Sequence, residues 1–143
     1  MPEVVGFFSG VFDLFHVGHL ENLKLANSGC DRLVVGVASD ELARMTRGTL
    51  PIVPAAERRE IVAAVRGVDD VVPIEHFDVP GLIADLAVDV VFVGDAEPDG
   101  PSVDTNVEDQ LRRAGVRVVR IVHGRATSSA TVQSALGQRS SVA

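Results

Sequence analysis

The sequence predicts an α/β fold in which helices cover both faces of a five-stranded parallel sheet. Five short runs rich in valine and isoleucine recur along the chain, and amphipathic segments separate them. These runs do not alternate apolar with polar residues, which is typical of strands buried on both faces. Strands of this kind that alternate with helices form parallel sheets with right-handed crossovers. The 143 residues are enough for one domain with a substantial core.

The individual elements follow in chain order. The expected strands are residues 4–8, 32–37, 68–73, 88–93 and 116–122. The expected helices are residues 18–27, 39–44, 55–65, 80–86, 106–114 and 129–136. Gly29 and Gly115 stand where the left-handed C-terminal caps of two helices would fall. We expect a single Rossmann-like domain over residues 1–143, with loops at 46–54 and 95–105 and a frayed tail at 137–143.

The composition excludes several classes of protein. Thirteen basic residues against twenty acidic ones give a formal net charge of −7, which argues against general nucleic-acid binding. No apolar run approaches the length of a membrane span, and the first residues do not resemble a signal peptide. Cys30 is the single cysteine, so no internal disulfide forms and a reducing cytoplasm is expected.

The segment from Gly10 to His19 reads Gly-Val-Phe-Asp-Leu-Phe-His-Val-Gly-His and follows the first expected strand. His16 and His19 lie three apart where this strand leads into the first helix. Ligands bind in the crevice at the carboxyl ends of such strands, and the free N–H groups of a helix start suit phosphate. Two imidazoles there can stabilise charge on a phosphorus centre. Alternatively, His16 caps a loop and His19 merely begins a helix, or the two bind a metal, which no further His or Cys cluster supports.

This segment resembles the G-x-F-D-x-x-H-x-G-H signature of the cytidylyltransferase family, above all its small members similar to glycerol-3-phosphate cytidylyltransferase. The H-x-G-H part alone is shared with several adenylyltransferases. The resemblance extends over residues 4–132 and implies that His16 and His19 contact the α-phosphate. It also implies that Gly10, Val11 and Phe12 line the nucleotide pocket. Gly18 lets the backbone approach phosphate closely.

Asp13 lies between the first expected strand and the two histidines and is included among the nucleotide-binding candidates. Its carboxylate can orient an imidazole or hold the loop through an Asx-type hydrogen bond. A purely structural role is an equal alternative.

Two other segments resemble phosphate-binding parts of the family. The sequence from Gly124 to Thr131 loosely resembles R-T-x-G-I-S-T/S-T, which binds the β- and γ-phosphates; the matching residues are Arg125, Ser128, Ser129 and Thr131. Alternatively, these hydroxyl residues only cap the last helix. Arg47, in a loop of the expected fold, stands where relatives carry a lysine that reaches the triphosphate. Because the chain has one lysine, Lys24, arginine must supply the local positive charge.

Two further resemblances concern the surroundings of the site. Arg58 and Arg66 match the arginines of an E-x-R…I-R-x-V-D pattern, which would place them on one helix face near the site, in a supporting or purely structural role. Gly94 and Asp95 match a G-D pair at which the chain turns toward the nucleotide. Relatives continue with Asp-Trp, whereas this chain continues with Ala96-Glu97 and has no tryptophan. Base recognition there is absent or rebuilt; Phe77 is a candidate to lie against the base, or a core residue.

The resemblance implies an enzyme that transfers CMP from CTP to a small phosphorylated alcohol similar to glycerol 3-phosphate. A phosphate acceptor is already an anion, so direct in-line attack releases pyrophosphate without a covalent intermediate or a protein base. Mg²⁺ is expected, held mainly by the nucleotide, and a homodimer is expected from the family. Two alternatives stay open: an adenylyltransferase that uses ATP on a sugar phosphate or a flavin-type acceptor, and a nucleotide-binding module without catalysis.

Overall fold

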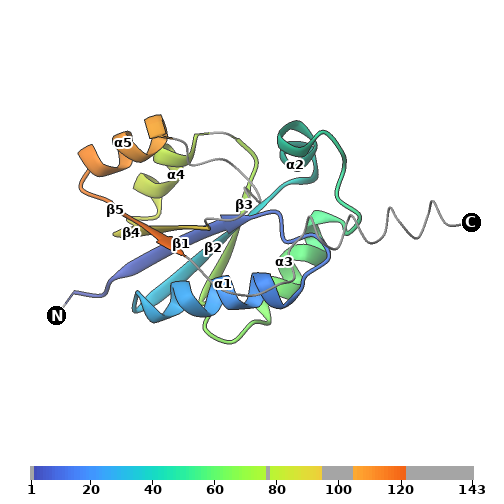
Figure 1. The fold of residues 1–143 in the computed structure, drawn as a ribbon, viewed down its shortest axis with the longest axis horizontal. Coiled ribbons are helices and arrows are strands. Elements are labelled where there is room, and N and C mark those ends of the chain that lie inside the picture. Colours follow the sequence, from blue (N-terminus) through green and yellow to red (C-terminus); the bar gives the residue numbers. More distant parts are fainter. Residues whose placement is uncertain (1, 77, 95–104, 122–143) are drawn as a thin grey trace, which may run out of the picture.

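Five parallel strands form the sheet that the valine-rich runs predict, and the α/β fold class is confirmed (Figure 1). The computed structural model describes residues 2–76, 78–94 and 105–121. The strands are β1 (Val5–Gly10), β2 (Arg32–Ala38), β3 (Asp70–Ile74), β4 (Val90–Gly94) and β5 (Arg117–Ile121). They lie in the order β3-β2-β1-β4-β5, and every neighbouring pair is parallel.

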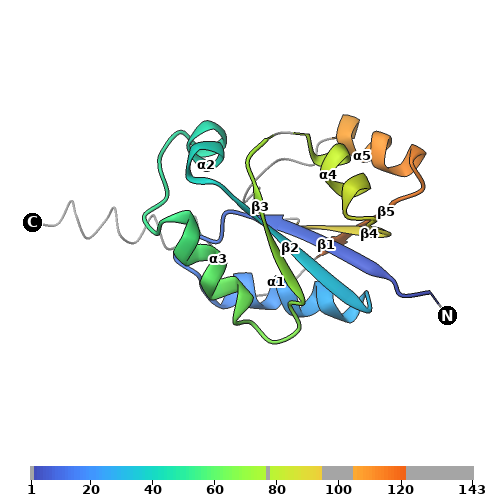
Figure 2. The same cartoon turned by 180° about the vertical axis from the view of Figure 1, so that it is seen from behind.

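Helices cover both faces of this sheet, as predicted. The described helices are α1 (Val17–Ser28), α2 (Asp40–Arg47), α3 (Ala55–Ala63), α4 (Val79–Asp85) and α5 (Thr105–Arg113). Figures 1 and 2 show α1 and α3 on one face and α2, α4 and α5 on the other. Two apolar clusters match these layers: Leu23 of α1 and Val62 of α3 belong to one, and Leu42, Ile83 and Leu111 belong to the other. The helix expected at 129–136 lies outside the described residues.

Two helix ends differ from the sequence-based expectation. The loop expected from Thr46 begins only at Gly48, because α2 continues to Arg47 and Gly48 closes it in the left-handed region at φ +85°. Gly115 also has a positive φ, as predicted. The left-handed cap predicted at Gly29 is wrong, since its φ is −101°. A Cβ at Gly29 would stand 2.8 Å from the Phe92 ring, so close packing explains this glycine.

The strand order places one crevice at the carboxyl edge of the sheet. From β1 the chain moves outward through β2 to β3, then returns to the other side of β1 for β4 and β5. The order therefore reverses between β1 and β4, and ligands of open α/β sheets bind at such a switch point. The turn that joins β1 to α1 starts at this position (Figure 1). Within residues 2–76, 78–94 and 105–121, no helix has the length and apolar character needed to cross a membrane.

Candidate active site

The turn between β1 and α1 has an unusual backbone. Phe12 and Leu14 both lie in the left-handed region, at φ 58° and 51°, although neither is glycine. Such conformations cost about 1–3 kcal/mol each and persist only where the surroundings hold them. The turn is held from beneath, because Val11 and Phe12 are fully buried in the two apolar clusters. The side chains of Val11 and Phe12 therefore pack into the core, and their predicted place in the lining of the nucleotide pocket stays a prediction.

His16 and His19 form a reciprocal cap at the start of α1. His16 is the N-cap residue, and its Nδ1 accepts the N–H of Gly18 at 3.0 Å. In return, Nδ1 of His19 accepts the N–H of His16 at 3.3 Å. Because both Nδ1 atoms accept backbone hydrogens, the neutral form of each ring carries its hydrogen on Nε2. The sequence thus builds two N–H donors on adjacent rings at a helix N-terminus.

The two imidazoles are stacked and packed against phenylalanines. Their ring centroids lie 4.0 Å apart with 20° between the planes. Phe12 meets His19 edge-on at 5.4 Å, and Phe15 lies 5.3 Å from the same ring. His19 is buried, whereas His16 is half-buried. The aromatic packing restricts the orientation of His19, and His16 is in turn fixed by the stack and by its cap. This is the preorganisation that electrostatic catalysis requires.

Asp13 holds a different loop from the one that the sequence suggested. Its buried carboxylate accepts the N–H groups of Ile52 and Val53, both at 2.9 Å. These contacts attach the segment between α2 and α3 to the histidine turn. The structural role considered for Asp13 is therefore the one that its contacts support, because both carboxylate oxygens accept backbone N–H groups.

Replacing Asp13 by alanine removes the acceptor of two buried amides. We expect the free energy of unfolding to fall by about 2–3 kcal/mol, since each bond is made to an ionised group. Urea denaturation measures this loss. Asp13→Asn, which keeps one acceptor oxygen, should lose less, and Asp85→Ala on the exposed side of α4 serves as the matched control. Equal midpoints for Asp13→Ala and wild type would contradict the role assigned to this carboxylate.

Arg58 is the most buried charged group among the described residues, at 0% exposed. Its guanidinium donates to the carbonyl oxygens of Val53 at 2.8 Å, Val11 at 2.6 Å and Ala38 at 2.8 Å. It also donates to Asp40 Oδ1 at 2.7 Å. These partners come from the ends of β1 and β2 and from the segments around α2. Arg58 therefore joins the carboxyl-edge loops to one another, and its contacts fit the structural alternative of the sequence interpretation.

Arg66 does not lie beside Arg58 at the carboxyl edge of the sheet. The helix that was expected to carry both ends at Ala63, and the N–H of Ala64 already donates back to Ile61. Arg66 is exposed in the following turn, where Gly67 at φ +96° stands beside Asn27 at the far end of α1. The N–H of Asp69 then donates to the carbonyl oxygen of Leu33 near the start of β2. The prediction that Arg66 lies near the site is wrong, because this turn lies at the amino edge of the sheet.

Arg47 is the last residue of α2, and its side chain is half-buried. Its Nη1 atom is buried, and no acceptor within the described part of the chain hydrogen-bonds to it. A buried donor without a partner costs about 1–3 kcal/mol and calls for an explanation. The contact between Arg47 and a triphosphate stays a prediction; an anion at this nitrogen would supply the missing acceptor.

The carboxyl end of β4 brings in a residue that the sequence analysis missed. A Cβ built on Gly94 would stand 3.8 Å from Nδ2 of Asn22, on the second turn of α1. Asn22 follows His19 by three residues, and this spacing on one helix face was the signal available in the sequence. The remaining predicted residues lie outside the described ranges: Asp95, Arg125, Ser128, Ser129 and Thr131, together with Phe77.

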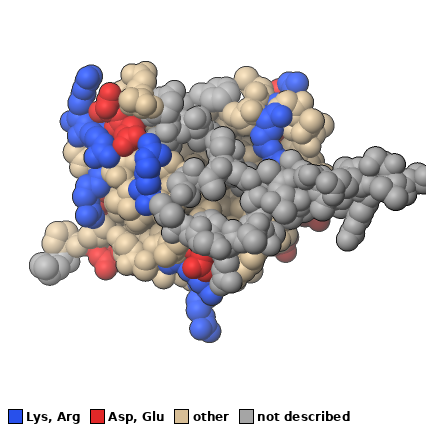
Figure 3. All heavy atoms as spheres, in the orientation of Figure 1, with Lys and Arg blue, Asp and Glu red and all other residues tan. Residues whose placement is uncertain are grey.

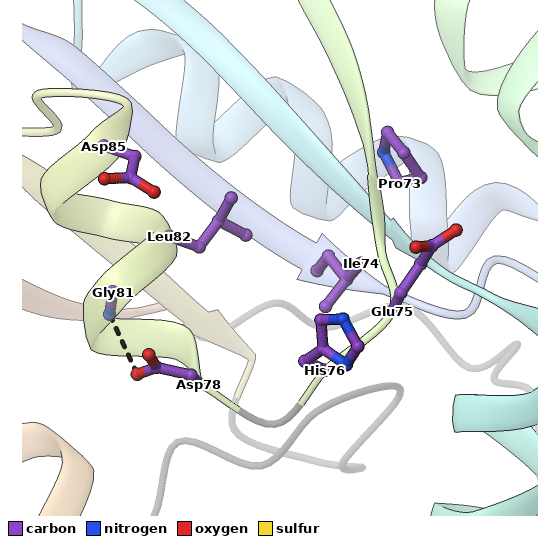
Figure 4. A pocket seen from close by; sticks show the side chains of 8 residues that line it. All are labelled: Pro73, Ile74, Glu75, His76, Asp78, Gly81, Leu82 and Asp85. Atoms are coloured by element: carbon purple, nitrogen blue, oxygen red, sulfur yellow. Dashed lines mark hydrogen bonds between the residues drawn. The ribbon is translucent and has the colours of Figure 1, made fainter.

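A separate pocket of about 280 Å³ lies at the carboxyl end of β3, between this strand and α4 (Figure 4). Its lining includes Glu75, His76, Asp78 and Asp85. Asp78 also caps α4, accepting the N–H of Gly81 at 3.0 Å. Three carboxylates make this pocket unfavourable for a polyanion such as a triphosphate. Across residues 2–76, 78–94 and 105–121, no group of three or more His, Cys, Asp or Glu side chains is placed to hold a metal.

Basic side chains gather around α5 and β5, where Figure 3 shows blue surface around a red centre. Glu108 accepts hydrogen bonds from Arg112 at 2.8 Å and from Arg120 at 2.9 Å. The hydrogen bond from Arg112 is the main reason that the pKa of Glu108 is lowered. Since Arg120 belongs to β5, these ion pairs connect helix to strand.

Comparison with known proteins adds four findings. A family model described as cytidylyltransferase-like matches residues 7–133. The FAD synthase of Pyrococcus abyssi is 41% identical over 110 residues, which cover 76% of this chain and 72% of that protein. The bifunctional protein HldE of Hydrogenovibrio crunogenus is 44% identical over 99 residues, which cover 68% of this chain but 21% of that protein. A lipopolysaccharide core biosynthesis protein from Thermoplasma volcanium has a similar structure, with a TM-score of 0.76, 25% identity and coverage of 87% of this chain and 100% of that one.

Proposed function

Because the chain belongs to the cytidylyltransferase-like family of nucleotidyltransferases, we propose that it transfers AMP from ATP to a phosphate monoester and releases pyrophosphate. The observation that carries this proposal is the stacked pair His16 and His19 at the start of α1. Each ring donates through Nε2, and the helix start adds backbone N–H groups and the positive end of its dipole. Charge that develops on the α-phosphate oxygens is stabilised there.

The proposed reaction is a direct in-line displacement. An oxygen of the acceptor phosphate attacks the α-phosphorus, and the bond to the pyrophosphate oxygen breaks. The acceptor is already ionised at neutral pH, so no protein group has to remove a proton. The imidazoles act as donors and form no covalent bond. Arg47, through its buried Nη1, neutralises phosphate charge, and Arg125 joins it in this proposal.

The choice of ATP over CTP is supported by the FAD synthases among the relatives. FAD contains an adenylate joined to a flavin mononucleotide, so an enzyme that makes it from these halves transfers AMP. The chain also lacks the Asp-Trp continuation expected of cytidylyl transfer and carries Ala96-Glu97 instead. CTP is therefore the second candidate, and the Gly10-x-Phe12-Asp13 motif is the feature that supports it.

The proposed acceptor is flavin mononucleotide, with glycerol 3-phosphate as the second candidate. Leu50 and Ile52 are 61% and 64% exposed on the segment that Asp13 attaches to the histidine turn. A planar flavin ring has an apolar face that can cover such side chains, whereas glycerol 3-phosphate has none. The relatives described above are FAD synthases and HldE proteins rather than glycerol-3-phosphate cytidylyltransferases.

Mg²⁺ is part of the proposal as a partner of the nucleotide. The described residues form no multi-ligand cage for a metal, so we assign its coordination to phosphate oxygens and water. When bound, the ion neutralises charge on the departing pyrophosphate. A homodimer and a cytoplasmic location stay predictions.

The test is pyrophosphate release from each of the four ribonucleoside triphosphates, with flavin mononucleotide, glycerol 3-phosphate and a sugar phosphate as acceptors. We expect release with ATP and flavin mononucleotide, accompanied by FAD on chromatography. Release with CTP and glycerol 3-phosphate would instead support the second candidate. Tight ATP binding without release from any acceptor would support the non-catalytic nucleotide-binding module and overturn the proposal.

A further inference from the structure

Asn22 occupies a position where the helix of the histidine pair meets the neighbouring strand. It lies one turn beyond His19 on α1, and residues three apart share a helix face. Its Nδ2 would lie 3.8 Å from a Cβ at Gly94, the last residue of β4. The amide is therefore located between α1 and the carboxyl end of β4. This is the side of β1 on which the strand order reverses and ligands bind.

The carbonyl oxygen of this amide is an acceptor without a donor. Oδ1 of Asn22 is buried, and no donor among residues 2–76, 78–94 and 105–121 reaches it. Buried acceptors of this kind are uncommon in folded proteins, because they lose the hydrogen bonds that water gave them. An apolar side chain at this position would avoid that loss. The placement of an asparagine beside the proposed site thus points to a donor on the ligand.

The ligand group at this depth is identified by distance along the helix. Three residues of α-helix rise about 4.5 Å, so Asn22 lies about that far from His19 along α1. This distance is similar to the length of a ribose ring with its substituents. In a nucleoside triphosphate whose α-phosphate contacts the histidines, the next unit is the ribose, and its hydroxyl groups are donors. Resting on the proposed function, we infer that Oδ1 of Asn22 accepts a hydrogen bond from a ribose hydroxyl. Asn22 is then a specificity-determining residue that favours ribonucleotides over deoxyribonucleotides.

Calorimetric binding of ATP, 2′-deoxy-ATP and 3′-deoxy-ATP, without acceptor, tests this inference. We expect the wild-type chain to bind one deoxy analogue about fivefold more weakly than ATP, the loss typical of one neutral hydrogen bond. Asn22→Ala should bind ATP about fivefold more weakly than wild type and should no longer discriminate against that analogue. Asn27→Ala, an exposed asparagine near the far end of the same helix, should keep the wild-type discrimination.

Asn22→Asp supplies the conservative variant, because its carboxylate retains the acceptor oxygen and should restore discrimination. If Asn22→Ala discriminates as wild type does, or wild type does not discriminate, the inference is overturned while the proposed function stands. If Asn22→Ala loses discrimination against inosine triphosphate instead, the donor is the base amine and the ribose assignment is wrong. If the wild-type chain binds no nucleoside triphosphate, the proposed function itself fails and the inference fails with it.

Discussion

Replacing His16 by asparagine is expected to lower kcat by about a hundredfold to a thousandfold, the loss typical of one preorganised donor to a developing oxyanion. Asparagine is among the best N-cap residues, so its side chain still accepts the N–H of Gly18 and α1 still begins at the same point. His19→Gln is the corresponding change at the other ring, because glutamine at this position preserves the reciprocal cap. Both changes therefore remove the imidazole while keeping the local structure.

Pyrophosphate release measures the effect, and the urea midpoint shows whether the fold is unchanged. His76→Asn is the matched control, since this histidine lies in the segment after β3 and lines the pocket between β3 and α4. It should leave kcat unchanged. If His16→Asn and His19→Gln both turn over at the wild-type rate, the histidines act only as caps and the proposed chemistry is wrong.

Replacing Arg58 by leucine is expected to produce the largest loss of stability, about 3–5 kcal/mol in the free energy of unfolding. The change leaves the carbonyl oxygens of Val11, Ala38 and Val53 without the donor that the guanidinium supplies. Arg58→Lys keeps the charge, but one ammonium has too few donors, with the wrong geometry, for four acceptors, so an intermediate loss is expected.

Urea denaturation, read as the midpoint at constant slope, measures these losses. Arg59→Leu on the same helix is the control, because its neighbour carries the buried contacts and Arg59 itself is half-buried. A change of less than about 1 kcal/mol in Arg58→Leu would show that the four contacts do not hold the carboxyl-edge loops together.

The fold could be predicted because its signal is local. The run that became β4 is apolar throughout, and so is the run of β2 after Arg32, so both identify strands buried on both faces without reference to the rest of the chain. The order of the strands was not available in this way, because five similar valine-rich runs carry no mark of which neighbour each one pairs with. The reason for Gly29 could not be predicted either, because its close contact with the Phe92 ring joins the end of α1 to β4, which are far apart in the sequence.

In the candidate site, too, local contacts could be predicted from the sequence and long-range contacts could not. The histidine pair could be predicted because the two residues that cap each other are three apart in the sequence. The partners of Asp13 and of Arg58 could not, since they lie 39 and 40 residues from Asp13 and up to 47 residues from Arg58. Asn22 was missed because only the tertiary approach of β4 to α1 leaves its carbonyl oxygen buried without a donor.

The central claim is that the two imidazoles stabilise charge on the α-phosphate without bonding to phosphorus. Exchange of labelled pyrophosphate into ATP tests it most directly, with and without flavin mononucleotide. Direct attack by the acceptor predicts that label enters ATP only when the acceptor is present, because the reverse reaction then requires the joined product. Label that enters ATP without any acceptor would reveal a nucleotidyl-enzyme intermediate and would contradict the claim.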